Sequence, residues 1–532
     1  MQASWNAMRR IAFCVIAALT LTAGAAPAES IPRLVPHEDT LQLLVDDRPF
    51  VMLAGELGNS TASTPQSMAP HWETLQRAGL NTVLAPVSWE LIEPEEGRFD
   101  FASVDSLLEG ARAHDQRLVI LWFGAWKNSM SSYVPAWVKR DAARFPRTTN
   151  AEGRRQEILS AFDPATRDAD AAAFAALMGH LARVDGERRT VIMVQAENEI
   201  GFLPTAREHG PVADAAWAGQ VPAELLARMA PGRSGSWGRV FGDTPAGEEI
   251  FQAWAYARYA EAVAAAGKAR YPLPMYVDAA LNRPGVAPGG YPSAGPLAHL
   301  FPVWDAGAPS IDLLAPDIYF EGFADWIAPY DRPGEALFIP EANRANRADT
   351  VANALFAIGR HDAIGFSPFS IENLTPEKAD ELETLYRQVE GAWPLIAPAR
   401  GTDRLDGFRA RVGDDGVAMA DTETMRMGDW VLTLTPVDPW TPRDQQDLRG
   451  HGALVLQTGA DELVVIGTGV TITIAAADPA KVAGLESVWL GEYAAGEWKP
   501  LRLLNGDETH QGRHVRLTPG PVQTQVVRLY AY

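Results

Sequence analysis

Two kinds of stretch alternate along the chain between about residue 40 and residue 375. Short apolar, β-branched runs, typical of buried strands, are separated by longer stretches with apolar residues at three- and four-residue spacing, typical of helices. Eight short runs occur, at residues 50–54, 82–86, 118–122, 191–194, 275–277, 313–316, 337–340 and 365–369, with helical stretches such as 103–114, 171–184 and 250–269 between them. Strands that alternate with helices form parallel sheets, and eight such strands close a barrel. The pattern therefore predicts an α/β fold, a (β/α)₈ or TIM barrel.

The structural alternative is an open, doubly wound sheet. That fold usually carries a glycine-rich phosphate-binding turn after its first strand. Here the first run leads into residues 55–60, Gly-Glu-Leu-Gly-Asn-Ser, which lack the required glycine spacing. The closed barrel is therefore the preferred prediction.

The chain changes character after residue 375. One more helical stretch, 376–389, is followed by short β-rich runs separated by turn residues, at 430–435, 453–457, 462–466, 470–474, 487–490 and 523–529. This change predicts a barrel domain at 29–375 and a smaller, all-β C-terminal accessory domain at 376–532. Such a domain supports the barrel or adds a binding surface, and we favour support.

The first 28 residues differ from the rest. Arg9 and Arg10 precede the apolar run 11–21, and small residues follow up to Ala26-Pro-Ala28. These features predict a secretory signal peptide, residues 1–28, that is cleaved after Ala28. The alternative, an uncleaved anchor, is disfavoured because the run is shorter than the ~20 residues that span a bilayer. We expect a periplasmic or secreted protein without a membrane anchor.

Composition narrows the chemistry. Cys14 is the only cysteine and lies in the predicted signal peptide, so the mature chain has no thiol for catalysis, metal binding or disulfides. The ten histidines form no His-Glu-x-x-His motif, and we expect no metal or other cofactor. Removal of residues 1–28 leaves 44 basic and 67 acidic residues, a net charge of −23. Such a surface repels nucleic acids and anionic membranes, whereas neutral substrates meet no penalty.

Two glutamates follow predicted strands that face each other across a barrel. The fourth run breaks into Gln-Ala-Glu-Asn-Glu at residues 195–199, and the seventh ends on Glu341. In barrels of this kind, the loops at the carboxyl ends of the strands converge on one mouth, where the chemistry takes place. Glu199 and Glu341 are therefore our candidate catalytic pair, although a single glutamate at a strand end is more often a cap or salt-bridge residue.

Paired carboxylates are the groups that cleave glycosidic bonds. One protonates the leaving oxygen, and the other attacks the anomeric carbon or activates water. A separation of about 5–5.5 Å gives retention through a covalent intermediate, and about 6.5–9.5 Å gives inversion. Opposed strand ends are compatible with the closer class.

The residues around the first glutamate resemble a known family. The run Glu-Asn-Glu-Ile-Gly at 197–201 is similar to the Glu-Asn-Glu-Tyr-Gly motif of glycoside hydrolase family 35, the β-galactosidases of clan A. Residues 89–101 are similar to the family's second-strand motif. The resemblance implies that Glu199 is the acid/base, that Asn198 binds the sugar 2-hydroxyl and that Glu341 is the nucleophile. It covers roughly residues 40–375, and the β-rich tail resembles that of a bacterial branch of the family.

The chain also departs from the family pattern. Tyrosine is replaced by Ile200, the asparagine usual after the second-strand tryptophan is Glu90, and the usual Arg-Pro-Gly-Pro-Tyr run of the third strand reads Leu-Trp-Phe-Gly-Ala-Trp-Lys-Asn at 121–128. These changes affect the residues expected to contact the sugar rather than the two glutamates. Family 42 β-galactosidases share much of the pattern and are a near rival.

Several other residues are candidates for binding substrate. Trp89, Trp122 and Trp126 lie near strand ends, where an aromatic face could stack on a sugar; packing between barrel and helices is the equal alternative for each. Asn128 follows in the third-strand run. Tyr319 follows the sixth run, and the resemblance to clan A implies that it hydrogen-bonds the nucleophile.

Two further residues have structural interpretations. For Asp317, at the end of the sixth run, we favour a structural salt bridge. Ser234 lies in Gly-Arg-Ser-Gly at 232–235 without the strand-to-helix elbow of a hydrolase serine, so we assign it to a loop.

The favoured hypothesis is a retaining, exo-acting β-galactosidase that releases terminal galactose from plant-type oligosaccharides or polysaccharides, with xyloglucan side chains among the targets that the resemblance implies. The alternatives are another clan A β-glycosidase, similar to family 42, and a carbohydrate-binding protein that has lost catalysis. The presence of both glutamates disfavours the last. The sequence does not predict an oligomeric state.

Overall fold

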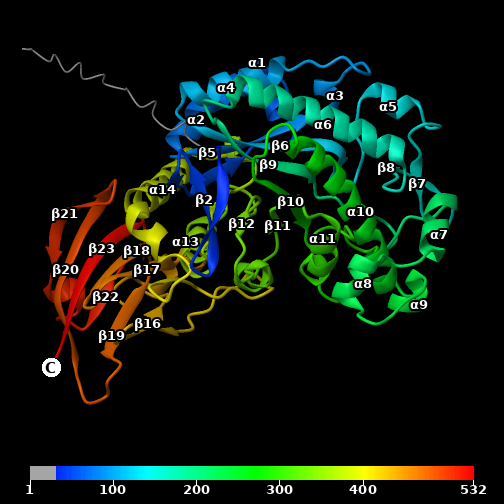
Figure 1. The fold of residues 1–532 in the computed structure, drawn as a ribbon. Coiled ribbons are helices and arrows are strands. Elements are labelled where there is room, and N and C mark those ends of the chain that lie inside the picture. The colour runs from blue at the N-terminus through cyan, green and yellow to red at the C-terminus, as the bar shows by residue number, and fades with distance from the viewer. Residues whose placement is uncertain (1–30) are drawn as a thin grey trace, which may run out of the picture.

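A computed structural model describes residues 31–532, so the predicted signal peptide lies outside the described residues. Eight parallel strands form a barrel (Figure 1), and they are β4 (Met52–Glu56), β5 (Thr82–Ser88), β6 (Arg117–Lys127), β9 (Val191–Asn198), β10 (Met275–Ala280), β11 (Leu313–Asp317), β12 (Phe338–Ile339) and β13 (Gly365–Phe366). The hydrogen-bonded order is β11-β10-β9-β6-β5-β4-β13-β12. A parallel bridge between Asp317 and Glu341 joins the two ends, and the Ile318 amide donates to the Glu341 carbonyl at 2.8 Å. The predicted barrel and its eight strands are confirmed.

The barrel interior is filled by every second residue of the strands. In β4, Met52 and Ala54 belong to the interior cluster, whereas Leu53 packs on the helix side. Tyr276 of β10 and Phe338 of β12 meet edge to face inside, with their centroids 5.4 Å apart. This two-residue alternation is the normal consequence of pleating, and it determines which strand-end residues point into the barrel mouth.

A small antiparallel sheet closes the amino end of the barrel. It comprises β1 (Arg33–His37), β2 (Thr40–Val45) and β3 (Arg48–Pro49). Leu43 and Val45 of β2 pack into the interior cluster of the barrel. The interior is therefore covered at this end, and the polar mouth lies at the other.

Helices surround the barrel. They are α1 (Pro65–Met68), α2 (Trp72–Arg77), α3 (Trp89–Ile92), α4 (Ala102–Ala113), α5 (Ala136–Arg140), α6 (Pro164–Asp185), α7 (Pro211–Ala218), α8 (Ala223–Met229), α9 (Trp237–Phe241), α10 (Pro245–Lys268), α11 (Phe301–Gly307), α12 (Phe323–Ile327), α13 (Thr350–Arg360) and α14 (Pro376–Ile396). The hairpin of β7 (Arg147–Thr149) and β8 (Arg155–Leu159) lies between α5 and α6. Ser234 lies in the loop between α8 and α9, as predicted. Within residues 31–532, no helix has the length and apolar character needed to cross a membrane.

Helix α14 is the eighth barrel helix. The side-chain oxygen of Thr375 accepts a hydrogen bond from the Lys378 amide and so caps the first turn, and Pro376 occupies the first helical position. The buried Tyr386 hydroxyl donates to the carbonyl oxygens of Ala54 and Phe366 at 2.8 and 3.2 Å. These contacts attach α14 to barrel strands β4 and β13, whereas the sequence pattern had grouped it with the β-rich part.

The C-terminal part is a sandwich of two antiparallel sheets, as the fold prediction required. One sheet has the order β14-β17-β18-β23-β20-β21 and the other β15-β16-β19-β22. Their bounds are β14 (Leu405–Arg409), β15 (Glu423–Met427), β16 (Trp430–Thr435), β17 (Gly452–Gly459), β18 (Glu462–Thr468), β19 (Thr471–Ala476), β20 (Ala483–Ala494), β21 (Glu497–Leu504), β22 (His514–Arg516) and β23 (Gln523–Ala531). Leu432, Val465 and Val527 lie in the apolar core between the sheets.

The sandwich packs directly on the barrel helices (Figure 1). Leu454 and Ile466 of the larger sheet belong to the same apolar cluster as the barrel helices. Glycines allow α13 and β14 to approach closely: a methyl group on Gly359 would lie 2.9 Å from the Cα of Gly407. The sandwich and the barrel therefore share one continuous hydrophobic contact.

Candidate active site

The structure brings the two predicted catalytic glutamates together. Glu199 follows β9, the fourth barrel strand, and Glu341 follows β12, the seventh. One carboxylate oxygen of each lies within 4.8 Å of the other and of an oxygen of Asp317. Glu199 and Glu341 are buried, with 7% and 3% of their surface exposed. Two buried carboxyl groups thus lie close together at the mouth.

Glu199 is held by its backbone and by two neighbouring side chains. Its amide donates to Oδ1 of Asp278 at 2.9 Å, and Nδ2 of Asn198 donates to Oδ2 of the same carboxylate at 2.7 Å. The exposed Asn128, at the end of β6, donates its amide to Oε2 of Glu199. The strand ends in a left-handed conformation at Glu199, with φ 46°, of the kind that concentrates at functional sites.

Burial is the largest cause of the raised pKa of Glu199. Desolvation, followed by the negative charge of Glu341, raises the pKa of Glu199 to about 8. The charge of Lys127 opposes this shift without cancelling it. At neutral pH the carboxyl group of Glu199 therefore carries a proton, as a general acid requires.

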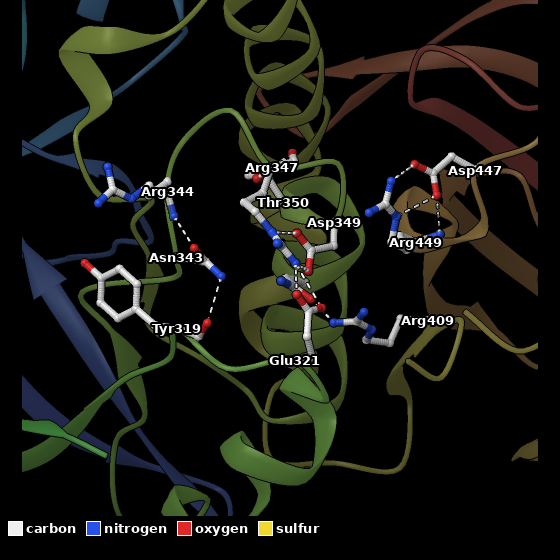
Figure 2. A network of polar contacts seen from close by, with 11 residues as sticks. Tyr319, Glu321, Asn343, Arg344, Arg347, Asp349, Thr350, Arg409, Asp447 and Arg449 are labelled. Carbon is white, nitrogen blue, oxygen red and sulfur yellow. Dashed lines mark hydrogen bonds and ion pairs between the residues drawn. The ribbon is translucent and has the colours of Figure 1, made fainter. Parts of the chain in front are cut away.

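Glu341 is positioned from the loop after β11. The Tyr319 hydroxyl donates a hydrogen bond to Oε2 of Glu341, as predicted. Nδ2 of Asn343 donates in turn to the carbonyl oxygen of Tyr319 at 3.1 Å, and Asn343 adopts a left-handed conformation with φ 59° (Figure 2). The loops that follow β11 and β12 are thereby tied together on either side of the nucleophile candidate.

Further charged side chains surround the pair. We call Glu56, Lys127, Glu199, Asp278, Asp317 and Glu341 the mouth cluster. All six are buried, and five of them are acids. Burial, then the charges of Asp278 and Glu341, raises the pKa of Asp317 well above its usual range, and burial raises the pKa of Asp278 to about 6. Protonated Asp317 can therefore donate a hydrogen bond to Asp278.

Lys127 is the cation of this cluster. Burial lowers the pKa of Lys127, but the charges of Glu341, Glu199, Glu56 and Asp278 outweigh burial and raise it overall. Its ammonium group also lies 4.9 Å from the ring centroid of Phe123, inside the barrel. The lysine stays charged and offsets part of the negative charge at the mouth.

The first glutamate of the Glu-Asn-Glu run has a different position. Glu197 points away from the mouth and accepts a hydrogen bond from the Trp126 amide at 2.8 Å. It lies beside Asp170, and burial followed by that charge raises the pKa of Glu197 well above normal. A methyl group on Gly124 would lie 2.7 Å from a carboxylate oxygen of either acid, so only glycine fits there. Glu197 and Asp170 therefore fix the ends of β6 and β9 from behind.

The structure corrects the expectation that indole rings stack on a sugar at Trp89 and Trp126. Both are fully buried. Trp89 donates to Glu93 at 2.8 Å, and Trp126 packs edge to face on Tyr256 and Tyr259 of α10. Trp122 is also fully buried. All three serve packing, the alternative left open by the sequence: alternation along β6 turns Trp122 and Trp126 toward the helices, and Trp89 begins helix α3.

The expected salt bridge of Asp317 is also corrected. Among the ion pairs of residues 31–532, none includes Asp317, which instead lies among the carboxylates of the mouth. Glu56, Lys127 and Asp278 were missed; Glu56 and Lys127 end β4 and β6, and Asp278 lies within β10. The strand-end criterion that selected Glu199 and Glu341 would have found Asp278 and Glu56, which follow the apolar runs 275–277 and 50–54, but not Lys127, which lies five residues beyond the run 118–122.

A second polar group links the mouth loops to the sandwich. We call Glu321, Arg347, Asp349, Asn353 and Arg409 the loop network (Figure 2). Arg347 bridges Glu321 at 2.8 Å and Asp349 at 3.2 Å. The buried Arg409 of β14 donates to the Asn353 side chain of α13 and lies 5.7 Å from the ring centroid of Phe323. Burial lowers the pKa of Arg409 to about 10, so it stays charged at neutral pH.

Two other features bear on where chemistry takes place. A cavity of about 840 Å³ lies near the amino end of the barrel, lined by Phe50, Glu390 and Trp393 among others, and no residue of the mouth cluster lines it. We assign the site to the mouth, because chemistry in such barrels occurs at the carboxyl ends of the strands.

The oxygens of Glu199, Asp317 and Glu341 are also close enough to hold a cation. The absence of a metal cofactor stays a prediction.

Comparisons with known proteins were made for both parts. Residues 61–266 match the model of glycoside hydrolase family 42, described as beta-galactosidase, and residues 382–516 match a family described as a domain of unknown function. A beta-galactosidase of Xanthomonas manihotis is 29% identical over 208 residues, which are 37% of this chain and 31% of that protein. The chain thus spans less than a third of this relative's length.

Among solved structures, the chain is similar to a cold-adapted beta-galactosidase from Rahnella sp. R3, with a TM-score of 0.46 and 16% identity over 68% of this chain and 57% of that one. It is also similar to the catalytic domain of a beta-amylase from Paenibacillus polymyxa, with a TM-score of 0.44 and 14% identity over 65% and 95% of the chains. The sequence match is to family 42, the near rival named in the sequence analysis. Membership of family 35 stays a prediction. Part of the barrel is therefore similar in sequence to beta-galactosidases of clan A.

Proposed function

We propose that this protein is a retaining β-glycosidase that hydrolyses terminal β-galactosides. The observation that carries the proposal is the opposition of Glu199 and Glu341, whose oxygens approach within 4.8 Å at the mouth. This separation matches the class that forms a covalent intermediate, in which no water fits between the second carboxylate and the anomeric carbon. The match of residues 61–266 to beta-galactosidases supports the same reaction.

The two carboxyl groups have different states, and these states fit different roles. Glu199 is protonated at neutral pH because its pKa is raised to about 8, so it can protonate the departing glycosidic oxygen. Glu341, which accepts the Tyr319 hydrogen bond, attacks the anomeric carbon and forms a glycosyl ester. Glu199, now ionised, takes a proton from water, and the water oxygen attacks the anomeric carbon from the face that the leaving group left. The bond to Glu341 breaks, the sugar is released with its configuration retained, and Glu199 is protonated and Glu341 ionised again.

A carbohydrate-binding protein that has lost catalysis is the second candidate. Binding alone requires hydrogen-bonding groups but no buried acid beside a buried carboxylate, an arrangement that costs folding stability. The mouth cluster retains this costly arrangement, which favours catalysis. Hydrolysis of 4-nitrophenyl β-galactoside separates the two candidates, because the binding protein would release no nitrophenol.

Trapping of the covalent intermediate tests the mechanism. A 2-deoxy-2-fluoro β-galactoside with a good leaving group should label the enzyme, because fluorine slows both steps while the leaving group keeps the first step viable. Mass spectrometry of the digest should find the label on Glu341. A label on another residue, or inverted configuration of the product by NMR, would defeat the proposal even if galactosides are hydrolysed.

The substrate is proposed to be a plant-type oligosaccharide or polysaccharide, with xyloglucan side chains among the targets. The rim of the mouth offers surfaces for sugars beyond the cleaved bond. Phe320 and Trp326, both partly exposed, lie with centroids 5.0 Å apart, and Tyr319 meets Phe369 edge to face at 6.2 Å. Such rings can stack on the apolar faces of sugars. Activity on galactosylated xyloglucan oligosaccharides, compared with lactose, would test this choice.

Export is proposed from the amino-terminal 28 residues. Cleavage after Ala28 should give a periplasmic or secreted protein that begins at Glu29. N-terminal sequencing of periplasmic material checks this. Recovery of the uncleaved chain in the membrane fraction would overturn it. The net charge of −23 after cleavage fits a neutral carbohydrate partner rather than nucleic acid or an anionic membrane.

A further inference from the structure

Glu56 is a member of the mouth cluster that takes no part in the proposed reaction. It ends β4, the first barrel strand, and its residue is fully buried. Met52 and Ala54 point into the barrel, while Gly55 faces Ile371 and Leu80 on the helix side. The two-residue alternation of β4 therefore directs the Glu56 side chain into the barrel, at the level of the mouth.

The carboxyl group of Glu56 has no protein partner. Within residues 31–532, neither of its oxygens accepts or donates a hydrogen bond. Its amide is used in the barrel, donating to the Pro368 carbonyl at 2.9 Å. Burial, then the charge of Glu341, raises the pKa of Glu56 well above its usual range. A buried carboxyl group without hydrogen bonds is destabilising and is retained in proteins mainly for function.

Lys127 supplies a buried cation from the third barrel strand. It ends β6 and is 4% exposed, and among the ion pairs of the described residues none includes it. Glu56 and Lys127 are each among the charges that shift the other's ionisation, together with Glu341 and Glu199. They therefore lie near one another and near the catalytic pair.

The opposite side of the mouth is already occupied by internal contacts. Asp278 accepts hydrogen bonds from the Glu199 amide and the Asn198 side chain, and Asp317 lies against Asp278. These residues of β10 and β11 position the acid/base. Glu56 and Lys127, at the ends of the first and third strands, make no such contacts with the catalytic pair.

We propose that Glu56 and Lys127 form a specificity-determining part of the glycone site and bind hydroxyl groups of the terminal sugar that lie away from the cleaved bond. This inference rests on the proposed function. The catalytic pair must flank the anomeric carbon, and β4 and β6 lie across the strand order from β10 and β11, so Glu56 and Lys127 can meet the part of the ring that the catalytic pair does not contact. A neutral glutamic acid both donates to and accepts from a hydroxyl, whereas an ammonium group only donates. Together they match the donor and acceptor capacity of two neighbouring hydroxyl groups.

The experiment compares substrates that lack one hydroxyl. We would measure kcat/KM for 4-nitrophenyl β-galactoside and for its 4-deoxy and 6-deoxy analogues, with wild type, Glu56→Leu, Glu56→Gln and Lys127→Met. The wild type should lose about 10²-fold or more on at least one deoxy substrate, because a site built to bind a hydroxyl rejects an analogue that lacks it. In Glu56→Leu and Lys127→Met this ratio should fall to within tenfold. Glu56→Gln, which keeps a donor and an acceptor, should retain most of it.

The ratio of kcat/KM for the galactoside to kcat/KM for a deoxy analogue separates binding of a sugar hydroxyl from positioning of the catalytic pair. A variant that only disturbs the catalytic pair would slow all three substrates equally and keep the wild-type ratio, and this result in both Glu56→Leu and Lys127→Met would overturn the proposal. Glu390→Gln, a matched change at the amino end of the barrel, should alter neither rate nor ratio. Thermal melting verifies folding, and Lys127→Met, which keeps an apolar stem over Phe123, serves if Glu56→Leu does not fold. If the wild type leaves the galactoside intact, the proposed function fails instead.

Discussion

The mouth cluster and the loop network are polar groups close to one another in the fold, yet they differ in how far their charged side chains are paired within the protein. In the loop network, Arg347 lies between two acids, and Arg409 has a side-chain acceptor in Asn353. In the mouth cluster, acids outnumber the cation, and both carboxyl oxygens of Glu56 and Oε1 of Glu341 have no hydrogen-bond partner within the described residues.

The difference indicates what each cluster does. Charges that are compensated inside the protein hold loops in place, whereas uncompensated buried charges cost folding stability and persist where a ligand completes them. By this criterion the loop network is scaffold and the mouth cluster is the site. Substitutions should therefore have opposite effects on activity and stability in the two places.

The largest effect is expected at the nucleophile. Glu341→Gln should lower kcat/KM for an aryl β-galactoside by about 10⁴-fold or more, because the amide cannot form the glycosyl ester. The Tm should stay level or rise, since one negative charge leaves a crowded acidic cluster. Activity assays and calorimetry on the same preparation check both. A large fall in Tm would place Glu341 with the scaffold.

Glu199→Ala should show a smaller effect that depends on the leaving group. A poor leaving group such as methanol should leave about 10³-fold more slowly, because general acid catalysis contributes in this range, whereas a dinitrophenolate needs little protonation. Azide should restore turnover and yield a β-glycosyl azide, since it attacks the ester without a general base. Equal slowing of both substrates, without rescue by azide, would remove Glu199 from the acid/base role.

Arg347→Met tests the other side of the comparison. Loss of the guanidinium leaves Glu321 and Asp349 facing each other, and should cost about 2 kcal/mol of folding stability and several degrees of Tm. Activity should fall only a few-fold, mainly in kcat, because the loops that carry Tyr319 and Glu341 become less firmly held. A loss of activity as large as that of Glu341→Gln, with unchanged Tm, would show that the loop network takes part in the reaction.

The smallest effect concerns pH and stability. An acid whose pKa is raised on folding binds more protons in the native state than in the unfolded chain, so stability falls as pH rises from the unfolded pKa to the folded one. For Glu199 this window runs from 4.5 to about 8. Glu199→Gln should flatten the fall in unfolding free energy across that window, as measured by urea denaturation at several pH values. Glu208→Gln is the matched control, because burial also raises the pKa of Glu208 to about 8, and it should flatten the curve without loss of activity.

The sequence predicted the barrel well because buried parallel strands are short apolar runs, which can be recognised without knowing which strands pair with one another. All eight runs became barrel strands, and Glu199 and Glu341 were found because they follow two of them. The strands β14, β15, β21 and β22 of the sandwich were missed. β14 contains Asp406, Gly407 and Arg409, and β21 is largely exposed. Their pairing depends on neighbours far along the chain.

The sequence could not predict which residues of β6 reach the site, for a similar reason. Trp126 and Lys127 are adjacent in sequence, but one packs on α10 and the other reaches the mouth. Only the register of β6 decides which side faces inward, and irregular pairing with β9 between Trp122 and Lys127 alters that register. A pattern of residue types along one strand does not reveal such an irregularity.

The close contact of Gly359 with Gly407 limits how this protein can be divided. Without the sandwich, α13 would expose a flat surface shaped to fit a strand backbone, together with apolar side chains that now share the barrel's cluster. A barrel cut free at residue 400 would therefore be prone to aggregation rather than an independent enzyme. In evolution, the sandwich is not an interchangeable appendage, and any exchange of it would have to carry a glycine opposite Gly359.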